Sequence, residues 1–325
     1  MKYILRRLGF YLIAFWAALT LDFIFPRLLP GDPATAILGP MGDRMTAAQI
    51  QALRQALGLV TNQSIIKQYF TYVVHVFHGD FGLSYANFPA PVTSVIATGF
   101  IWTILLGTVS LLISVVVGHL IGILASWRRN GFFDIIVPPL FNFIGALPPF
   151  FLGLGILYLF ALYLGWFPIG HAYADTLVPA FTWQFVASIF THLALPAITS
   201  VLVTTTVWVQ IMRNTMISVL AEDYITMAEA KGLHQNRIMF NYAARNAILP
   251  SVTGFGVFLG SILSGQILIE NVFSYPGLGF LLVRAVGSRD YPMMQGLFLG
   301  ITTGVLLVNF LVDILYTRID PRIRK

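Results

Sequence analysis

Six long apolar runs, separated by polar stretches, dominate the pattern of this chain. They cover residues 8–28, 99–125, 132–164, 192–212, 251–269 and 293–316. A helix needs roughly 20 predominantly apolar residues to cross the hydrocarbon core of a bilayer, and each run is about that long or longer. The pattern therefore predicts six transmembrane helices.

Composition supports the same class. The chain is 57% hydrophobic and only 10% charged, and it contains no cysteine. Soluble domains carry about 25% charged residues, so we predict an all-α integral membrane protein. The missing cysteines exclude disulfides and thiolate chemistry.

The first run predicts an uncleaved span. Lys2, Arg6 and Arg7 precede it, as in a signal peptide, but large residues stand where a cleavage site would need small ones. Residues 1–29 are thus expected to form the N-terminus and first transmembrane helix. Asp22 lies inside this helix, where a packing or interfacial role is favoured over a role in transport.

Residues 30–98 are too long and too polar for a simple loop. Thr46 and Gln49 form a capping box for a helix that ends at Gly58, and a second amphipathic helix is expected over 62–77. His75 and His78 have a spacing that can hold a metal, but no third ligand is near, so we predict surface histidines and no metal site. Residues 30–98 are interpreted as a small extracytoplasmic helical cap.

Polar residues and prolines inside the apolar runs mark a candidate translocation pathway. The run 132–164 contains two proline pairs, at 138–139 and at 148–149, which kink a membrane helix. A bent helix that merely packs is the alternative. The candidate pathway residues are Asn142, Pro148, Gln210 and Gln266.

Two further polar segments are expected on the same face as the cap. Residues 165–191 lack Lys and Arg but contain Trp166 and Trp183, which is typical of an interfacial segment, and a short surface helix is expected near 180–190. Residues 270–292 combine a turn with a short amphipathic helix.

Positive charge gives the topology. The first seven residues hold three Lys or Arg, the turn at 128–129 two, the polar insert at 213–250 four and the last eight residues four, which is thirteen of the nineteen. Because positively charged loops stay in the cytoplasm, both termini and the insert are expected there. This placement also explains the net charge of +6 without nucleic acid as a partner.

The insert at 213–250 is the main charged island between apolar runs. Glu222 and Asp223 are typical of a helix start and Gly232 of a helix end, which predicts a short helix over 222–231. A second amphipathic segment follows over 234–246, before Leu249 and Pro250. This hairpin is either an ordinary interfacial loop or a docking element for a cytoplasmic partner.

Motifs in the insert and beyond it resemble one family. Thr226-Met227-Ala228, then Gly232 after three residues, with Leu249-Pro250 downstream, resembles the EAA loop of ABC importer permeases. The order EDY, AKG, RNA and LP resembles the dipeptide, oligopeptide and nickel branch, whose Gly to Leu-Pro spacing is longer than in sugar importers. The strings PGDPA and GDFGLS in the cap, YPGLG at 275–279 and DYP at 290–292 resemble its first permease subunit.

The resemblance implies the fold of a type I ABC importer permease, with a five-helix core over 99–325. It implies that the insert couples the permease to an ATPase through the residues Glu222, Asp223, Tyr224, Thr226, Ala228, Ala230 and Gly232. The implied partners are a second homologous permease, one or two cytosolic ATPase subunits, an external substrate-binding protein and membrane lipid. The implied location is the bacterial cytoplasmic (inner) membrane, and short peptides are the family's commonest cargo, with nickel chelates and oligosaccharides as alternatives.

The energy source is expected outside this chain. The sequence lacks GxxxxGK[ST], so ATP and Mg²⁺ would be bound by the ATPase partners, and no nucleophile with a base partner suggests an enzyme. A proton-coupled transporter would need buried carboxylates, and only Asp22 and Asp313 qualify, both near span ends. That class, and a membrane anchor that recruits cytosolic proteins, remain as alternatives.

Overall fold

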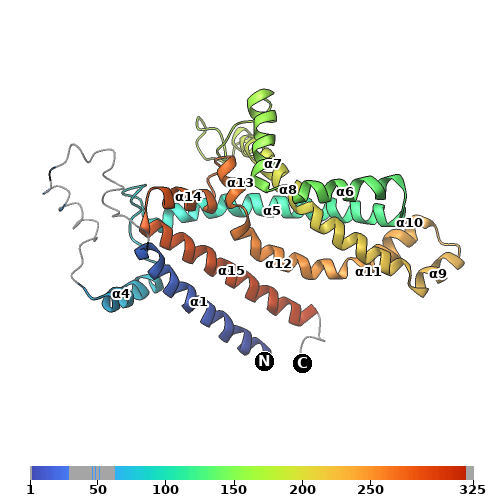
Figure 1. Ribbon diagram of the computed structural model, residues 1–325, viewed down its shortest axis with the longest axis horizontal. Coiled ribbons are helices and arrows are strands. Elements are labelled where there is room, and N and C mark those ends of the chain that lie inside the picture. The colour runs from blue at the N-terminus through green and yellow to red at the C-terminus, as the bar shows by residue number, and fades with distance from the viewer. Residues whose placement is uncertain (1, 29–45, 47, 49–50, 52–62, 320–325) are drawn as a thin grey trace.

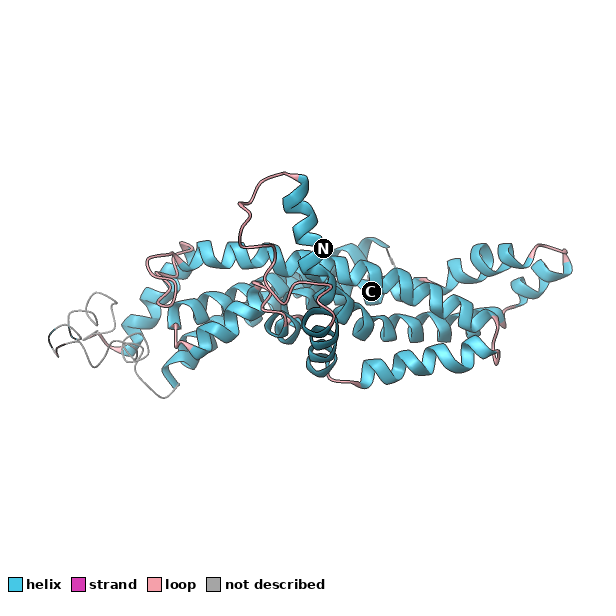
Figure 2. Ribbon diagram, turned by 90° about the horizontal axis from the view of Figure 1, so that it is seen from above, coloured by secondary structure: helices cyan, strands magenta, loops and turns pink. Residues whose placement is uncertain are grey.

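The computed structural model describes residues 2–28, 46, 48, 51 and 63–319. Within these residues the chain is almost entirely helical (Figures 1 and 2). In this described part, four helices are long and apolar enough to cross a membrane: α1 (Lys2–Leu28), α5 (Val92–Trp127), α8 (Trp183–Leu220) and α15 (Tyr291–Ile319). The prediction of an all-α membrane protein is confirmed.

The count of six spans stays a prediction. The bent pair of α6 (Phe132–Ala146) and α7 (Pro149–Ile156), which continues as a π-helix over Leu157–Tyr163, makes a fifth candidate if it is taken as one span. The sixth candidate, α12 (Leu249–Gly265), has 17 residues. At 1.5 Å per residue it is about 25 Å long, shorter than the roughly 30 Å core of a bilayer.

The third apolar run is bent, as its proline pairs predicted. Its two halves meet at Leu147 and Pro148 with a bend of 100°. Pro138 and Pro139 lie inside α6 without breaking it, whereas Pro148 is extended and Pro149 occupies the first turn of α7. A proline fits the first turn of a helix because that position donates no intrahelical hydrogen bond, so the second proline pair starts a new helix.

The fourth apolar run is longer at both ends than predicted. The expected surface helix near 180–190 forms the first turns of α8, where the Thr182 hydroxyl caps the helix by accepting the Phe185 N–H (3.3 Å). At its other end α8 continues through Arg213 to Leu220, inside the polar insert. The predicted helix over 192–212 was too short, because polar residues at its two ends are compatible with a continuing helix.

Helices α5 and α8 form the centre of the bundle, and glycines let them approach closely. A Cβ atom at Gly122 of α5 would lie 2.7 Å from the Cβ of Met212 on α8, closer than real side chains come. Small residues at such contacts drive helix association in membranes. Beside this pair, α6 packs on α8, and α15 packs on both α1 and α12.

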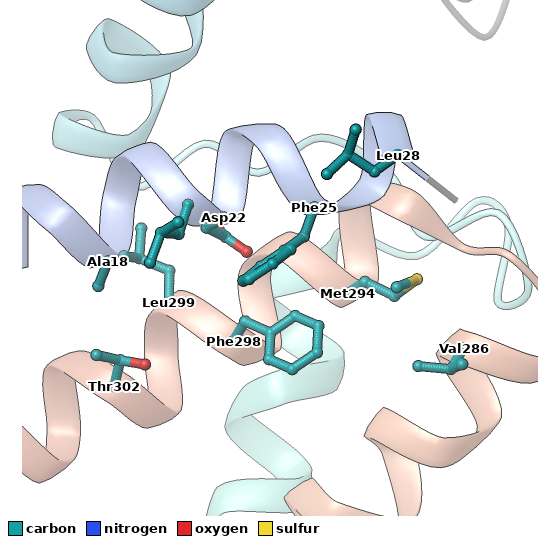
Figure 3. A pocket seen from close by; sticks show the side chains of 10 residues that line it. Ala18, Asp22, Phe25, Leu28, Val286, Met294, Phe298, Leu299 and Thr302 are labelled. Carbon is teal, nitrogen blue, oxygen red and sulfur yellow. The ribbon is translucent and has the colours of Figure 1, made fainter. Parts of the chain in front are cut away.

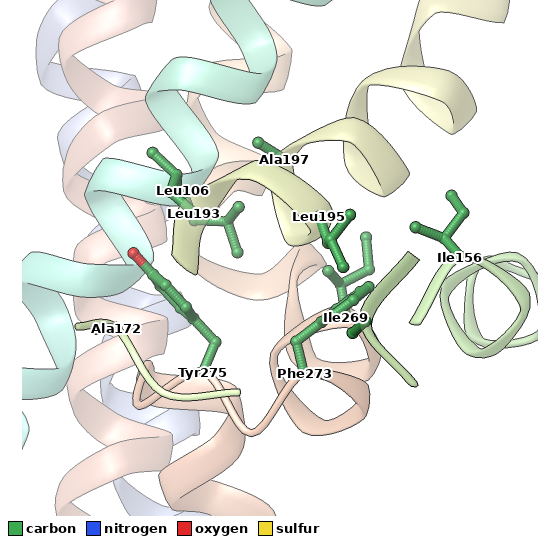
Figure 4. Close-up of a cluster of buried hydrophobic side chains, with 10 residues drawn as sticks. Leu106, Ile156, Ala172, Leu193, Leu195, Ala197, Ile269, Phe273 and Tyr275 are labelled. Carbon is green, nitrogen blue, oxygen red and sulfur yellow. The ribbon is translucent and has the colours of Figure 1, made fainter. Parts of the chain in front are cut away.

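A buried apolar cluster joins α5 and α8 to the segment over residues 269–275 (Figure 4). Leu106 of α5 and Leu193 of α8 pack against Phe273 and Tyr275, which follow the short helix α13 (Ile267–Val272). Tyr275 is fully buried. The turn at 273–277 then leads into α14 (Leu278–Gly287), which confirms the predicted turn and short helix in 270–292.

Two buried carboxylates, Glu270 and Asp290, connect the segment over 270–290 to other parts of the fold by hydrogen bonds. Glu270 accepts hydrogen bonds from the Thr103 hydroxyl (2.7 Å) and from the N–H groups of Gly279 (2.7 Å) and Phe280 (3.1 Å). Asp290 accepts from the Ser84 hydroxyl (2.5 Å) and the Ala86 N–H (2.9 Å). The blocks around 270–290 are thereby tied to α5 and to the segment before it.

In the polar stretch after α1, helix α4 (Ile65–Phe77) is capped by Ser64 and matches the predicted helix over 62–77. Its Tyr69 and Val73 pack against α1. Most of the predicted helix from Thr46 to Gly58 lies outside the described residues.

The termini of α1 and α15 meet at one end of the bundle (Figure 1). The Tyr11 hydroxyl donates to Asp313 (2.7 Å), and the Arg7 guanidinium lies 3.4 Å from the same carboxylate. In the described part of the chain, Asp313 is thus held by two side chains of α1.

Candidate functional site

The polar insert folds into a helical hairpin at the end of α8 (Figure 1). Helix α9 (Asp223–Ala230) matches the predicted first helix and is followed by a tight turn. In this turn the Gly232 N–H donates to Glu229 (2.8 Å) and the Leu233 N–H to Ala228 (3.3 Å), with Gly232 at φ +70°. These are the two hydrogen bonds of a Schellman motif, so Gly232 ends the helix in the way its sequence position predicted.

The return arm of the hairpin is continuous. It consists of α10 (Gln235–Arg237), a π-helix over Ile238–Ala244 and α11 (Arg245–Ala247). His234 caps its start by accepting the Asn236 N–H at Nδ1 (3.3 Å). The arm matches the second amphipathic segment expected over 234–246.

A small core of its own holds the hairpin. Ile225 and Ala228 of α9 are only 2% and 3% exposed, and they pack against Ile238 and Met239 of the return arm and Met216 of α8. Because this core is continuous with the end of α8, the hairpin is a packed extension of the bundle rather than a free loop.

Six of the seven predicted coupling residues lie on the exposed surface of the hairpin: Glu222, Asp223, Tyr224, Thr226, Ala230 and Gly232. Ala228, the seventh, faces the hairpin core. The Tyr224 hydroxyl accepts a hydrogen bond from Asn246 Nδ2 (3.0 Å), which links α9 to the return arm. Ala228 therefore serves the packing of α9, and its neighbours form the surface.

Met227 adds a large apolar side chain to this surface, and the residue is 59% exposed beside Thr226. Tyr224, 38% exposed, lies on the same helix. Large apolar side chains at the tip of an otherwise polar hairpin are typical of a protein contact.

An ion pair connects the base of the hairpin to the neighbouring helix. Arg213 Nε lies 2.6 Å from Asp134 Oδ1, and Arg213 Nη2 lies 3.1 Å from Asp134 Oδ2. The Asn130 N–H donates to the same carboxylate (3.0 Å). This forked geometry orients both groups and joins the end of α8 to the start of α6. The pair was not predicted, because Arg213 and Asp134 are far apart in the sequence.

The candidate pathway residues fall into two places. Gln210 Nε2 donates to Asn142 Oδ1 (2.6 Å) on an exposed face between α8 and α6. Gln266 instead lies at the break between α12 and α13, where its Nε2 donates to Ser200 (3.0 Å). Pro148 stands at the α6–α7 bend, and its neighbour Pro149 lines a cavity with Gln266. The structure brings Asn142 and Gln210 into contact, and it places Pro148 next to a residue that shares a cavity with Gln266.

Asp22 borders an apolar cavity of about 550 Å³ between α1 and α15 (Figure 3). Its carboxylate accepts a hydrogen bond from the Tyr72 hydroxyl of α4 (2.7 Å), and the residue is only 3% exposed. The other oxygen, Oδ1, has no hydrogen-bond partner among the described residues. The contact with Tyr72 agrees with the packing role expected for Asp22.

The histidines of α4 make local contacts. His75 lies 3.1 Å from Asp80, and His78 Nδ1 lies 2.7 Å from the Val74 carbonyl oxygen. Asp80 also accepts the Gly82 N–H, and this bond, with the contact to His75, holds the pKa of Asp80 below its ordinary range. Across the described part of the chain, no group of three His, Cys, Asp or Glu residues could hold a metal.

Comparison with known proteins decides the family. Residues 118–325 match the family described as the inner membrane component of binding-protein-dependent transport systems, and residues 1–116 match the N-terminal part of such membrane components. The chain belongs to this family of permeases. As an ABC importer permease, it is a multi-pass protein of the inner membrane, and its family works with a partner permease, ATPase subunits and a periplasmic binding protein.

The similarity to individual relatives extends over the whole of this permease. The glutathione transport system permease protein GsiC of Salmonella choleraesuis (strain SC-B67) is 37% identical over 325 residues, which is 100% of this chain and 99% of the relative. The protein of the same name from Escherichia coli (strain K12) is 35% identical over 324 residues, with the same shares covered. The resemblance read from the EAA-like motif is thereby confirmed at the level of the family.

Proposed function

We propose that this permease forms half of the translocation pathway of an ATP-driven importer for short peptides. The observation that carries the proposal is the full-length similarity to permeases named for glutathione, which is itself a tripeptide. The motifs of the dipeptide and oligopeptide branch support the same substrate class. Nickel chelates and oligosaccharides are the competing cargoes.

Uptake by the assembled transporter tests the cargo. The permease would be produced with its partner permease, ATPases and binding protein in cells that lack other peptide importers, and uptake of radiolabelled glutathione and dipeptides measured. Peptide uptake that an excess of unlabelled peptide abolishes supports the proposal. Uptake of a nickel chelate or an oligosaccharide, with none of any peptide, overturns it.

The proposed coupling site is the exposed surface of α9 with the turn at Gly232. In this account α9 sits in a groove of a cytosolic ATPase, with both termini of the permease on the same cytoplasmic side. ATP and Mg²⁺ bind to the ATPases, and closure of those subunits moves α9. The packed core of the hairpin passes this movement to α8, and the pair of Arg213 and Asp134 passes it to α6.

Substrate would enter from the opposite face. The binding protein docks on the cap of residues 30–98, on the face where 165–191 and 270–292 are also expected, and releases its ligand between the two permeases. ATP binding favours the outward-open state, and hydrolysis restores the inward-open state. This is alternating access driven by contacts that differ between two states.

A stand-alone, proton-coupled transporter is the competing mechanism, and Asp22 discriminates between the two. Because Asp22 is held by Tyr72 beside an apolar cavity, Asp22→Ala should leave most ATP-dependent uptake intact. Uptake by the purified chain in liposomes without ATP, with collapse in Asp22→Ala, would favour proton coupling. A membrane anchor would show neither kind of uptake.

A further inference from the structure

A second cavity lies inside the permease, between α5, α8 and α12, at the bend before α7. Its volume is about 220 Å³, and its polar lining comes from Ser110, Ser200, Thr204 and Gln266. Pockets for drug-sized ligands measure roughly 300–1,000 Å³, so this one suits a single small group. No charged side chain is present among the described residues that line it.

Two polar groups at this cavity lack a partner in the described part of the chain. The Ser110 hydroxyl is one, and its residue is only 2% exposed. The other is Gln266 Oε1, on the amide whose Nε2 is held by Ser200. A buried polar group without a hydrogen bond costs about 1–3 kcal/mol, so both groups favour a ligand that supplies one donor and one acceptor.

The backbone around the cavity is broken on two sides. The bend of 100° between α6 and α7 stands next to Pro149, and Gln266 itself occupies the break between α12 and α13. In membrane transporters, interrupted helices occur where the backbone is buried in protein or borders a polar path. The position of the two breaks thus agrees with a cavity that receives a polar group during transport.

We propose that this cavity is a transient subsite for one backbone amide of the transported peptide. Gln266 Oε1 accepts the peptide N–H, and the Ser110 hydroxyl donates to the peptide carbonyl. An uncharged, mostly apolar lining suits a peptide bond and rejects the charged ends of the substrate. This inference rests on the proposed function and adds the residues that contact the substrate.

An amide-to-ester exchange in the substrate tests the Gln266 contact. Uptake of a tripeptide would be compared with that of its depsipeptide analogue, in which an ester oxygen replaces one N–H, for each backbone position in turn. In the wild-type transporter, the loss of one hydrogen bond should lower uptake efficiency about tenfold at one position. In Gln266→Leu this tenfold contribution should disappear, so that only the part of the ester effect that arises in the binding protein remains.

The comparison has internal controls. The external binding protein also reads the peptide, but it is the same in every variant, so its share of the ester effect cancels in the double-mutant cycle. Ser200→Ala removes the partner of Gln266 Nε2 and leaves Oε1 in place, so it should retain most of the ester effect. Gln210→Leu alters the pair with Asn142 outside the cavity and should retain all of it.

Ser110→Ala gives a second, independent measurement, because it tests the other proposed hydrogen bond. The variant should fold, since it removes only one buried oxygen. A thioamide is a weaker hydrogen-bond acceptor than an amide, so in the wild type a thioamide substrate should be taken up less well than its amide counterpart. In Ser110→Ala the two substrates should differ much less, because the donor is missing. Unchanged ester and thioamide effects in Gln266→Leu and Ser110→Ala, in assembled transporters, would overturn the subsite. Absence of peptide uptake by the wild type would instead overturn the proposed function.

Discussion

The backbone N–H of Leu233 donates to the carbonyl oxygen of Ala228 over 3.3 Å, across the left-handed residue Gly232. This bond folds the chain back directly after α9, and Ala228 is at the same time buried in the hairpin core. The exposed surface of α9 is thus fixed to the end of α8. A rigid connection of this kind is what transmission of force from an ATPase requires.

Replacing Gly232 tests this geometry. A residue with a side chain costs about 1–2 kcal/mol in the left-handed conformation, while asparagine tolerates it. A Cβ at this position would meet no atom within 4 Å, so any effect is conformational. Gly232→Val should abolish transport and weaken ATPase association, with normal membrane insertion.

Gly232→Asn is the matched control and should retain most transport. Association would be measured by co-purification of the ATPase, and insertion by the amount of permease in the membrane fraction. Normal transport by Gly232→Val would show that the turn is not part of the coupling.

Met227 and Ile225 separate contact with a partner from internal packing. Met227 is 59% exposed, so Met227→Asp should weaken ATPase association without altering the stability of the permease. Ile225 is 2% exposed, so Ile225→Asp should unfold the hairpin and lower the thermal stability of the purified permease. If both variants lose association and stability together, Met227 belongs to the fold and not to an interface.

The ion pair of Arg213 and Asp134 should show asymmetric effects on stability. Asp134 is 4% exposed in its side chain and Arg213 is 28% exposed. Arg213→Ala leaves a buried carboxylate without its cation and should cost about 3 kcal/mol, whereas Asp134→Ala leaves a guanidinium that can reach solvent and should cost less.

The double variant should be more stable than Arg213→Ala alone, because it removes the uncompensated charge. The free energy of unfolding in detergent, measured for all four proteins, gives the coupling energy. Strict additivity would mean that the two side chains do not stabilise each other.

The turn after α4 should loosen in acid. The Gly82 N–H and His75 lower the pKa of Asp80 from its ordinary value of 3.8. A carboxyl whose pKa is depressed in the folded state stabilises the fold above its ordinary pKa, and this contribution is lost as the pH falls through the folded value. We expect amide hydrogen exchange over residues 79–91 to become faster as the pH falls below the ordinary pKa of 3.8, after correction for the intrinsic pH dependence of exchange.

Asp80→Asn is the control for this titration, because its turn should be looser at neutral pH and change little on acidification. An acid-induced rise of the same size in both proteins would assign the effect to another group.

The hairpin could be predicted from preferences of residues that are neighbours in the sequence. The contacts inside the bundle could not be predicted in this way. Helix α9 and its end at Gly232 follow from capping and glycine preferences over neighbouring residues. The ion pair of Arg213 with Asp134 and the hydrogen bonds of Glu270 depend on contacts between distant segments. No periodicity in one segment reports these contacts.

The bend at Pro148 shows the same division. The prolines marked a kink, but two proline pairs were present and only the second starts a new helix. Which pair breaks the helix depends on what packs around it, and Pro138 is buried inside α6. Gln266 was predicted as a pathway residue from its polarity alone, and its cavity appears only when α5, α8 and α12 are brought together.

Cross-linking from Met227 tests the central claim most directly. A photo-activatable residue at position 227, in the assembled transporter in its native membrane, should form a cross-link to the ATPase subunit that changes in yield when ATP is bound. The same residue at Ile225, which is buried, should give none. Labelling of position 227 from outside the cell, or cross-links that never include a nucleotide-binding subunit, would contradict the account.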